Sequence, residues 1–209
     1  MSRERRRGVL VVGITGGIGS GKGLAAEFFR RQGAVIIDAD EVAHDLTRPG
    51  APLTLRIAAE FGPEFLRQDG CLDRRKLAAA VFGDPRAVAR LNALTHPPIV
   101  AAIDRELARL AAEGEARIIC LVAPLLLEVG YGREQKVDRV LVLAADEEER
   151  IRRTMARDGL TAEEVKQRIA AQMPLQEQRR RADWVVDTAA GRQQALDQLE
   201  SIWRELNRE

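Results

Sequence analysis

The sequence has few cysteines and almost no excess of either charge, and each of these features excludes a class of protein. The 209 residues contain two cysteines, Cys71 and Cys120, whose spacing is typical of neither a zinc site nor a disulfide framework, so we expect a reducing compartment. The 33 Lys and Arg residues nearly balance the 32 Asp and Glu residues, which leaves a formal net charge of +1. We expect no nucleic-acid partner, because a chain without a field of one sign must bind anions by local clusters.

Long apolar runs are also absent. The longest, Ile118 to Leu127, is about half the ~20 residues that a membrane helix needs. The basic opening "MSRERRR" is followed by an apolar run that stops at a glycine-rich segment and offers no small-residue cleavage site. We therefore expect a cytoplasmic protein with no membrane partner. Its length suffices for a core that needs no disulfide or metal staple.

Short apolar segments alternate with helical ones along the chain. The helical segment after the first apolar run closes on Gly33, a residue suited to a helix C-terminal cap. The predicted strands are rich in Val, Ile and Leu and lie in residues 9–15, 34–38, 117–128, 138–145 and 183–187. Strands that alternate with helices imply right-handed β-α-β units, so we predict an α/β fold with three layers, α/β/α, around a parallel sheet.

Two regions depart from this alternation. Residues 49–114 read as helices interrupted at "FGPEF", "QDGCLD" and "FGDPR" without a clear buried strand, which is typical of an inserted helical lobe. Residues 147–182 are helical and densely charged, and we expect them to form a lid. The remaining stretches, 8–48, 115–146 and 183–209, then form the core domain.

The stretch "GITGGIGSGKG" at residues 13–23 contains the motif G-x-x-x-x-G-K between a predicted strand and a predicted helix, the context of a P-loop. Glycines allow backbone N–H groups to curl around a polyphosphate, and the helix adds its positive N-terminal end. Lys22, one of only four lysines, is placed to reach the β- and γ-phosphates. The alternative is a glycine-rich turn with a solvated lysine. We predict a P-loop NTPase fold with an ATP site formed by Gly17, Gly19, Ser20, Gly21, Lys22, Gly23 and Leu24.

The P-loop alone leaves the reaction open. A GTPase of the Ras type needs N-K-x-D to read guanine, yet the only asparagines, Asn92 and Asn207, are not followed by lysine. The chain is short for a motor or transporter ATPase, and the late arginine-rich helices favour a small kinase with a closing lid.

Two aspartates follow the second predicted strand, in "IIDADEVAHDL". Asp38 and Asp40 lie at a strand's carboxyl end, the edge where parallel sheets bind ligands. One carboxylate there accepts a proton from an attacking hydroxyl, and the other helps to hold Mg²⁺, partly through water. The structural alternative is that one of them caps a helix that begins near Glu41, and capping and catalysis can coexist.

At this point the sequence resembles the bacterial dephospho-CoA kinases. The motifs "TGGIGSGK", "IDADEVAH", "LNALTHPPI", "PLLLE" and "RTMARDGL…RIAAQMP" occur in that family's order and spacing, from about Val9 to Gly191. The resemblance implies transfer of the γ-phosphoryl group of ATP to the ribose 3′-hydroxyl of dephospho-CoA, the last step in making coenzyme A. It also implies that lobe 49–114 grips this substrate and that 147–182 is a mobile lid.

The resemblance implies roles for individual residues. Asp40 maps to the catalytic base, and Arg153 maps to a lid arginine. Arg157 is four residues on, so both guanidinium groups share one helix face and can clamp phosphate oxygens. The other arginines of this region, Arg150, Arg152 and Arg179 to Arg181, are interpreted as solvated or paired with Glu147 to Glu149 and Asp183.

Three more residues are candidates for the substrate side. His96 precedes Pro97-Pro98, a pair that predicts a helix boundary, and the resemblance places this H-P near the substrate. Leu125 and Glu128, in "PLLLE", follow a buried strand, where leucines form either an apolar wall for the substrate or ordinary core.

The sequence departs from the family pattern at three positions. Gly23 stands where P-loop kinases carry a Ser or Thr that ligates Mg²⁺, and water is able to take that ligand position. Thr188 stands where the family has asparagine in a loop expected near the adenine, and Val122 offers no acid ahead of Pro124. Two alternatives therefore stay open: a related nucleotide or nucleoside kinase, and a nucleotide-binding protein that has lost turnover through Gly23.

Overall fold

The computed structural model describes residues 8–81, 83–114, 116–130 and 136–208. Five strands lie in these residues: β1 (Leu10–Thr15), β2 (Val35–Asp38), β3 (Ile118–Val122), β4 (Arg139–Ala144) and β5 (Trp184–Asp187). The helices there are α1 (Lys22–Arg31), α2 (Ala39–Leu46), α3 (Pro52–Phe61), the 3-10 turn η2 (Pro63–Phe65), α4 (Arg74–Val81), α5 (Pro85–Glu113), α6 (Glu147–Asp158), α7 (Ala162–Ala170), α8 (Leu175–Arg180) and α9 (Arg192–Leu206).

The strands form one parallel sheet in the order β2-β3-β1-β4-β5. β1 lies at its centre, paired in parallel with β3 on one side and β4 on the other. The predicted α/β fold is therefore confirmed. The segment that follows β1 leaves the carboxyl edge of the sheet at its middle, which is where open parallel sheets bind ligands.

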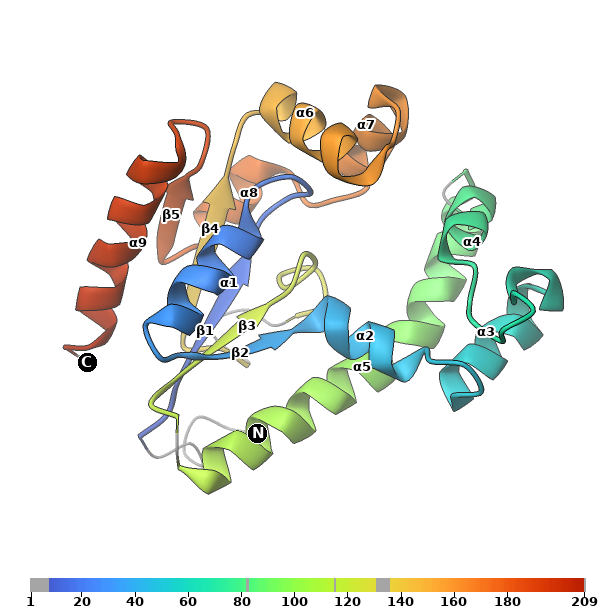
Figure 1. Ribbon diagram of the computed structural model, residues 1–209, viewed down its shortest axis with the longest axis horizontal. Coiled ribbons are helices and arrows are strands. Elements are labelled where there is room, and N and C mark those ends of the chain that lie inside the picture. Colours follow the sequence, from blue (N-terminus) through green and yellow to red (C-terminus); the bar gives the residue numbers. More distant parts are fainter. Residues whose placement is uncertain (1–7, 82, 115, 131–135, 209) are drawn as a thin grey trace. The chain divides into compact units, whose positions relative to one another are not determined.

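Helices α1 and α9 cover one face of the sheet, side by side (Figure 1). Phe29 of α1 is fully buried, and its ring lies 6.1 Å from the ring of Trp203 in α9. Both helices pack their apolar stripes onto Val12, Ile14 and neighbouring strand residues. Because successive side chains of a strand point to opposite faces, Val11 and Gly13 face the other side, where Leu126 and Val137 lie against Gly13.

The predicted cap at Gly33 is confirmed. Gly33 has φ +99°, its N–H donates to Arg30 O, and the N–H of Ala34 donates to Phe29 O. These are the two bonds of a Schellman motif, which ends α1 and turns the chain into β2.

The chain divides into two compact units, one of Met1–Ile37 with Ala108–Glu209 and the other Asp38–Leu107. The first unit contains the sheet apart from Asp38. The second has its own apolar core of residues from α3, η2, α4 and the start of α5: Leu53, Ile57, Phe65, Leu72, Leu77, Val81 and Ala87. This division differs from the expected lobe of residues 49–114, because α2 contacts α3 and so groups with the second unit.

One sequence prediction about this unit was wrong. Pro97 and Pro98 do not end a helix, since α5 continues from Pro85 through both of them to Glu113. A proline in a helix interior removes a backbone donor and usually kinks or breaks the helix. Here apolar burial on both sides of the pair outweighs that cost, with Leu91 and Leu94 packed before it and Ile103 buried after it.

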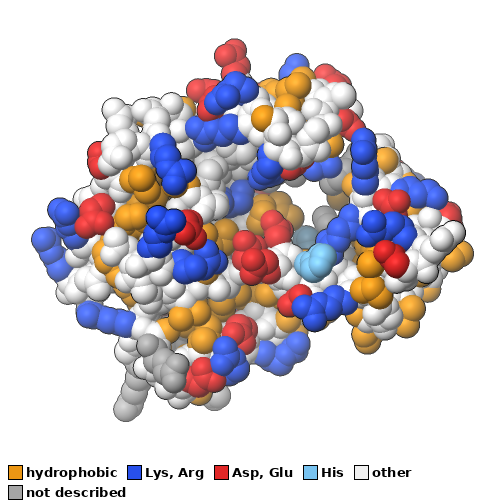
Figure 2. Space-filling view, viewed as in Figure 1, with side chains coloured by type: hydrophobic (Ala, Val, Ile, Leu, Met, Phe, Trp, Pro, Cys, Tyr) orange, Lys and Arg blue, Asp and Glu red, His pale blue; other side chains and the backbone are white. Residues whose placement is uncertain are grey.

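Acidic and basic side chains are interspersed on the face of the molecule in Figure 2, in keeping with the balanced composition. Among the described residues, no helix combines the length and the apolar character that crossing a bilayer requires.

Candidate active site

The loop between β1 and α1 carries the P-loop motif, as predicted. Lys22 is the first residue of α1, and its Nζ donates to two carbonyls of the same loop, Gly16 O at 2.7 Å and Gly17 O at 3.0 Å. A further bond from Ser20 N to Gly17 O, 3.1 Å long, tightens the turn. The lysine ammonium is therefore held over the loop, next to backbone N–H groups of the kind that donate to a polyphosphate.

Arg150 of α6 lies against this loop, which corrects the interpretation of it as a solvated or carboxylate-paired residue. Only 7% of it is exposed, and its Nε donates to Ile18 O at 2.9 Å. Burial lowers the pKa of the Arg150 guanidinium from its usual value, and the Glu147 charge opposes that shift. Gln172, just after α7, completes the contact, because its Oε1 accepts from Ile18 N at 2.9 Å and from Arg150 Nη2 at 3.3 Å.

Two glycines of the motif make this approach possible. A Cβ placed on Gly17 would collide with the Arg150 guanidinium. A Cβ on Gly19 would lie 2.5 Å from Arg150 O and 2.8 Å from Thr154 Oγ1. The glycines at these positions thus admit helix α6 as well as a phosphate chain.

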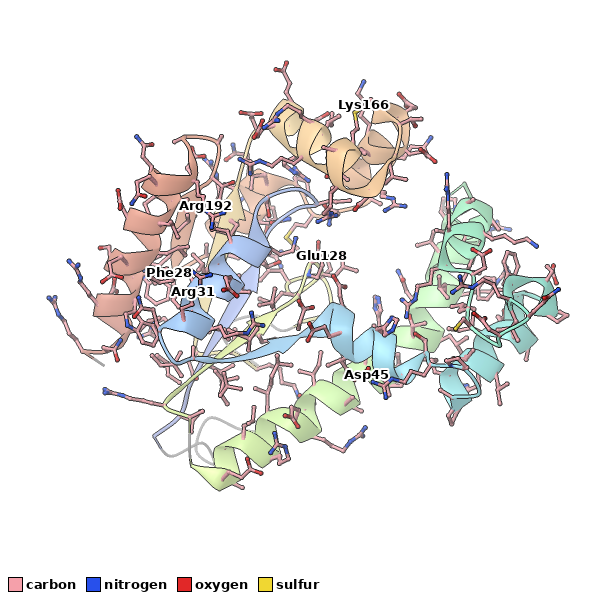
Figure 3. All side chains as sticks on the ribbon, viewed as in Figure 1. Phe28, Arg31, Asp45, Glu128, Lys166 and Arg192 are labelled. Atoms are coloured by element: carbon pink, nitrogen blue, oxygen red, sulfur yellow. The ribbon has the colours of Figure 1, made fainter. Side chains whose placement is uncertain are left out.

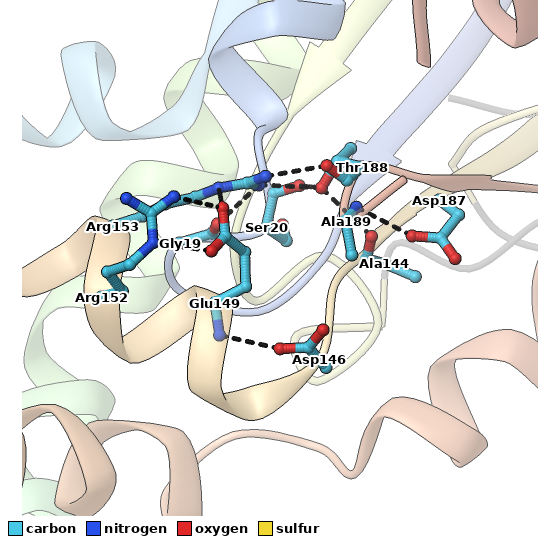
Figure 4. Close-up of polar contacts among 10 residues, drawn as sticks. All are labelled: Gly19, Ser20, Ala144, Asp146, Glu149, Arg152, Arg153, Asp187, Thr188 and Ala189. Atoms are coloured by element: carbon cyan, nitrogen blue, oxygen red, sulfur yellow. Dashed lines mark hydrogen bonds and ion pairs between the residues drawn. The ribbon is translucent and has the colours of Figure 1, made fainter. Parts of the chain in front are cut away.

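Arg153 is on the same helix and contacts Thr188 and the P-loop residue Gly19 (Figure 4). Its Nη2 donates to Thr188 O at 2.7 Å, and its Nη1 donates to Thr188 Oγ1 at 2.9 Å and to Gly19 O at 3.5 Å. The buried Thr188 hydroxyl lies within 2.9 Å of Ser20 O and 3.1 Å of Ala144 O, and it has one proton to donate between them. Thr188 therefore ties the P-loop, the end of β4 and Arg153 together.

Glu149 pairs with two arginines of α6, Arg152 and Arg153. Arg152 donates to its carboxylate at 2.6 Å, and Arg153 Nε at 2.7 Å. The hydrogen bond from Arg152, followed by that from Arg153, lowers the pKa of Glu149 to about 2. The pairing expected for Arg152 is confirmed. Arg180 and Arg181 are also paired, each with Glu177.

Arg157 points elsewhere than Arg153 in this structure. It is exposed, and its Nε bonds the neighbouring Asp158 at 2.7 Å. The two arginines share α6, as the spacing predicts, and the bonds described for Arg157 go to Asp158, whereas those of Arg153 go to Glu149, Gly19 and Thr188.

The remaining P-loop candidates differ in exposure. Ser20 is buried, and its Oγ has no hydrogen-bond partner among the described residues. Gly21 caps α1 with φ +92°, and Leu24 is half-buried in the first turn. Gly23 is exposed, and nothing lies within 4 Å of where its Cβ would be. A serine side chain at position 23 therefore fits without displacing any described atom.

Leu125 and Glu128 lie on the turn that follows β3, and Glu128 is labelled in Figure 3. Leu125 is half-buried, while Leu126 and Leu127 beside it are core. Glu128 is exposed and accepts a hydrogen bond from Met173 N at 3.0 Å. This carboxylate thus fastens the segment after α7, in addition to any contact with a substrate.

Asp38 and Asp40 are placed by the end of β2. Asp38 is its last residue and the N-cap of α2, and its Oδ1 accepts from Asp40 N at 2.8 Å. The capping alternative is therefore realised by Asp38, and α2 begins at Ala39 rather than near Glu41. Asp40 is exposed in the first turn, where its backbone is fixed by the cap and its carboxylate is accessible to solvent.

His96 is half-buried inside α5, and burial lowers its pKa and so favours the neutral imidazole. It belongs with Asp40 to the second unit, whereas Lys22, Arg153 and Glu128 belong to the first. The structure thus brings Lys22 and Arg153 together at the P-loop, and it describes Asp38, Asp40 and His96 within the other unit.

Among the described residues, no group of three or more His, Cys, Asp or Glu side chains is arranged to hold a metal ion. Mg²⁺ in nucleotide sites is bound by one or two carboxylates together with phosphate oxygens and waters. Asp38 and Asp40 supply two carboxylates of this kind in one unit, and in the other unit the space at Gly23 is open.

Sequence reasoning missed the contacts of Arg150, Gln172 and Thr188 with the P-loop. Thr188 stood out only as a departure from a family pattern, and Gln172 only as one letter of a longer motif. Arg150 lies in a run of charged residues, where neither charge nor periodicity distinguishes a buried arginine from its exposed neighbours.

Comparisons with known proteins show which proteins this chain is similar to. A family model described as dephospho-CoA kinase matches residues 10–194. A dephospho-CoA kinase of Syntrophotalea carbinolica is 41% identical over 198 residues, 95% of this chain and 92% of that protein. The crystal structure of a Thermus thermophilus protein, 39% identical, superposes with a TM-score of 0.78 over 95% of this chain and 98% of its own. A dephospho-CoA kinase from Campylobacter jejuni, 25% identical, has a TM-score of 0.62 over 95% of this chain and 98% of its own.

Proposed function

The chain belongs to the dephospho-CoA kinase family, and on that premise we propose how its residues carry the γ-phosphoryl group of ATP to the ribose 3′-hydroxyl of dephospho-CoA. The observation that carries the proposal is the P-loop at the central strand, with Lys22 Nζ held over it. Among P-loop proteins, that arrangement orients the β- and γ-phosphates for in-line transfer.

The donor side binds and orients ATP. The N–H groups of Gly19, Gly21 and Lys22 donate to the phosphate oxygens, and the positive end of α1 attracts the phosphate charge. Lys22 Nζ exchanges its loop carbonyls for β- and γ-phosphate oxygens and stabilises the charge that develops during transfer. Arg153 is proposed to leave Thr188 for the transferring group when the lid, residues 147–182, closes.

The acceptor side supplies the nucleophile. The Asp40 carboxylate accepts the proton of the ribose 3′-hydroxyl as that oxygen bonds to the γ-phosphorus. The bond from the γ-phosphorus to the β,γ-bridging oxygen breaks, and its electron pair leaves with ADP. Asp38 holds the turn that presents Asp40, through the bond to Asp40 N.

Mg²⁺ is proposed as the metal of the site. It supplies neutralisation of phosphate charge and fixes the geometry of the triphosphate. The oxygens proposed to hold it are those of the phosphates, of water at the Gly23 position, and of Asp38 and Asp40, partly through water.

The remaining candidates are assigned to substrate binding. The helical lobe, residues 49–114, with His96, is proposed to grip dephospho-CoA. Leu125 is proposed to give it an apolar contact, and Glu128 a polar one. Arg157 is proposed to join Arg153 at the phosphates on lid closure, leaving Asp158. A cytoplasmic location is proposed because the chain belongs to a family of biosynthetic kinases.

The test is ADP release with a panel of acceptors. Purified protein with ATP and Mg²⁺ is expected to release ADP in step with added dephospho-CoA, and not with AMP, UMP or pantothenate. Release with AMP or UMP instead would assign a related nucleotide kinase. Tight ATP binding without ADP release on any acceptor would assign a binding protein that lacks turnover.

A further inference from the structure

The peptide groups on both sides of Ile18 are held by side chains from outside the P-loop. Gln172 Oε1 accepts the Ile18 N–H, and Arg150 Nε donates to the Ile18 carbonyl, each at 2.9 Å. The two side chains also contact each other at 3.3 Å. Ile18 stands between Gly17 and Gly19, so these bonds act on the most freely rotating part of the loop.

We propose that Arg150 and Gln172 are positioning residues that hold the Ile18 peptide groups and thereby preorganise the P-loop for the triphosphate of ATP. The proposal rests on the function proposed above and adds residues to it. Neither side chain is expected to touch the reacting atoms.

The physical basis is the entropy of the loop. A glycine-rich loop loses much backbone freedom when it orders around phosphate. Fixing one residue in its bound orientation beforehand removes part of that loss, and so tightens binding of both ATP and ADP. The bonds are also well placed to be strong, because Arg150 is buried and a guanidinium donor is charged.

The two side chains reach the loop from the two ends of the α6–α7 segment. Arg150 is in the first half of α6, and Gln172 follows the last residue of α7, Ala170. Just beyond, Met173 N is fastened to Glu128. The segment expected to move as a lid is therefore held to the P-loop near both of its ends, at Arg150 and Gln172. The part of α6 and α7 between these two residues is then the part that moves.

Arg150 permits a matched pair of substitutions. In Arg150→Gln the side-chain nitrogen occupies the same place along the chain as arginine Nε, so the donor to Ile18 O is kept while the charge is lost. In Arg150→Met a methyl group takes that place. Gln172→Met removes the acceptor of the Ile18 N–H at nearly constant volume. The controls are Arg152→Met and Gln167→Met, since Arg152 is exposed on α6 and Gln167 is exposed on α7, the helix just before Gln172.

The first experiment measures the dissociation constants of ATP and ADP without acceptor, by calorimetric titration, beside KM for dephospho-CoA, kcat and the melting temperature. We expect Arg150→Met and Gln172→Met each to weaken both nucleotides about tenfold, with KM for dephospho-CoA unchanged. Arg150→Gln should stay within about threefold of wild type. The double Met variant should be scarcely weaker than either single one, because both act on one residue.

Several results would overturn the proposal. Unchanged nucleotide affinity in both Met variants, with wild-type turnover intact, removes it and leaves the proposed function standing. Equal losses in Arg150→Gln and Arg150→Met assign the effect to charge rather than to the hydrogen bond. A wild type that binds no ATP overturns the proposal and the proposed function together.

The second experiment needs no variant and so covers the case in which the Met variants do not fold. Amide hydrogen exchange of Ile18 is measured in the wild-type protein without nucleotide. The bond to Gln172 predicts slow exchange at Ile18, well below the rate of an open loop. Exchange of Ile18 at the unprotected rate would contradict a preorganised loop.

Discussion

The helices that follow β1 and β2 differ in how firmly their N-terminal ends are held and in how much of each helix is buried. After β1, the P-loop is bonded by α6, by Gln172 and by Thr188, and α1 buries Ala25, Ala26 and Phe29. After β2, Asp38 caps α2, but none of the eight residues of α2, all of which the structure describes, is buried. The donor side is thus built as a fixed cradle, whereas the residue proposed to accept the proton is presented on an accessible helix. Preorganisation serves the phosphates, and accessibility serves an acceptor that must arrive and leave.

The largest effect is expected from the fixed side. Lys22→Ala should lower kcat/KM by about 10³-fold, because the ammonium is the charge held over the loop. The melting temperature should change little, since the bonds described for this side chain go to carbonyls of the loop itself. Steady-state kinetics measures the loss, with Lys166→Ala, exposed on α7 and labelled in Figure 3, as the control. Near-normal turnover in Lys22→Ala would remove the P-loop assignment.

The accessible side should respond differently. Asp40→Asn is expected to lower kcat by about 10²-fold with little change in ATP affinity, because asparagine keeps the shape but is a very poor base. Asp45→Asn is the control on the same helix, where Asp45 pairs with Arg48 at 2.7 Å. Loss of ATP binding with an unchanged rate at saturation would instead make Asp40 a metal or nucleotide ligand.

A substitution of Thr188 tests how much the hydrogen bonds around the P-loop contribute to stability. Thr188→Val keeps the shape but removes the hydroxyl near Ser20 O and Ala144 O, and should lower the free energy of unfolding by about 1–3 kcal/mol. Thr95→Val is the matched control, because the bond described for the Thr95 hydroxyl goes to Leu91 O within the same helix rather than to a separate element. Urea denaturation measures the free energy of unfolding of both variants. Equal losses would show that the Thr188 hydroxyl contributes no more than an ordinary intrahelical hydrogen bond.

The smallest effect is expected at Gly23. Gly23→Ser adds a hydroxyl where P-loop kinases have one, and nothing lies within 4 Å of the new Cβ. The variant should need a few times less Mg²⁺ for half-maximal rate, and its stability should hold or rise by up to about 0.5 kcal/mol, since serine favours a helix over glycine. Mg²⁺ titrations of ADP release and thermal melts measure both. Identical Mg²⁺ curves would show that the hydroxyl is dispensable here.

Local patterns were sufficient for much of the fold and for the motif itself. The alternation of apolar strands with helices, the glycine-rich turn and the Gly33 cap each depend on residues close in sequence, and the structure has all three. The continuation of α5 through Pro97 and Pro98 depends instead on burial on either side of the pair, which no local rule at the prolines reports.

The side-chain hydrogen bonds to the P-loop join residues far apart in the sequence, and for that reason the sequence did not reveal them. Arg150 is 132 residues from Ile18, and Gln172 is 154 residues from it. Arg150 and Arg152 look alike in the sequence, yet one is 7% exposed and the side chain of the other is 71% exposed. Only the packing of α6 on the loop separates them.

The most direct test of the account is the identity of the phosphorylated product. Wild-type protein is incubated with ATP, Mg²⁺ and dephospho-CoA, and the product is analysed by ³¹P NMR and mass spectrometry. The account predicts one new phosphomonoester, on the ribose 3′-oxygen, formed in equal amount to ADP. ADP formed without a phosphorylated acceptor, or a phosphate at another position, would contradict it.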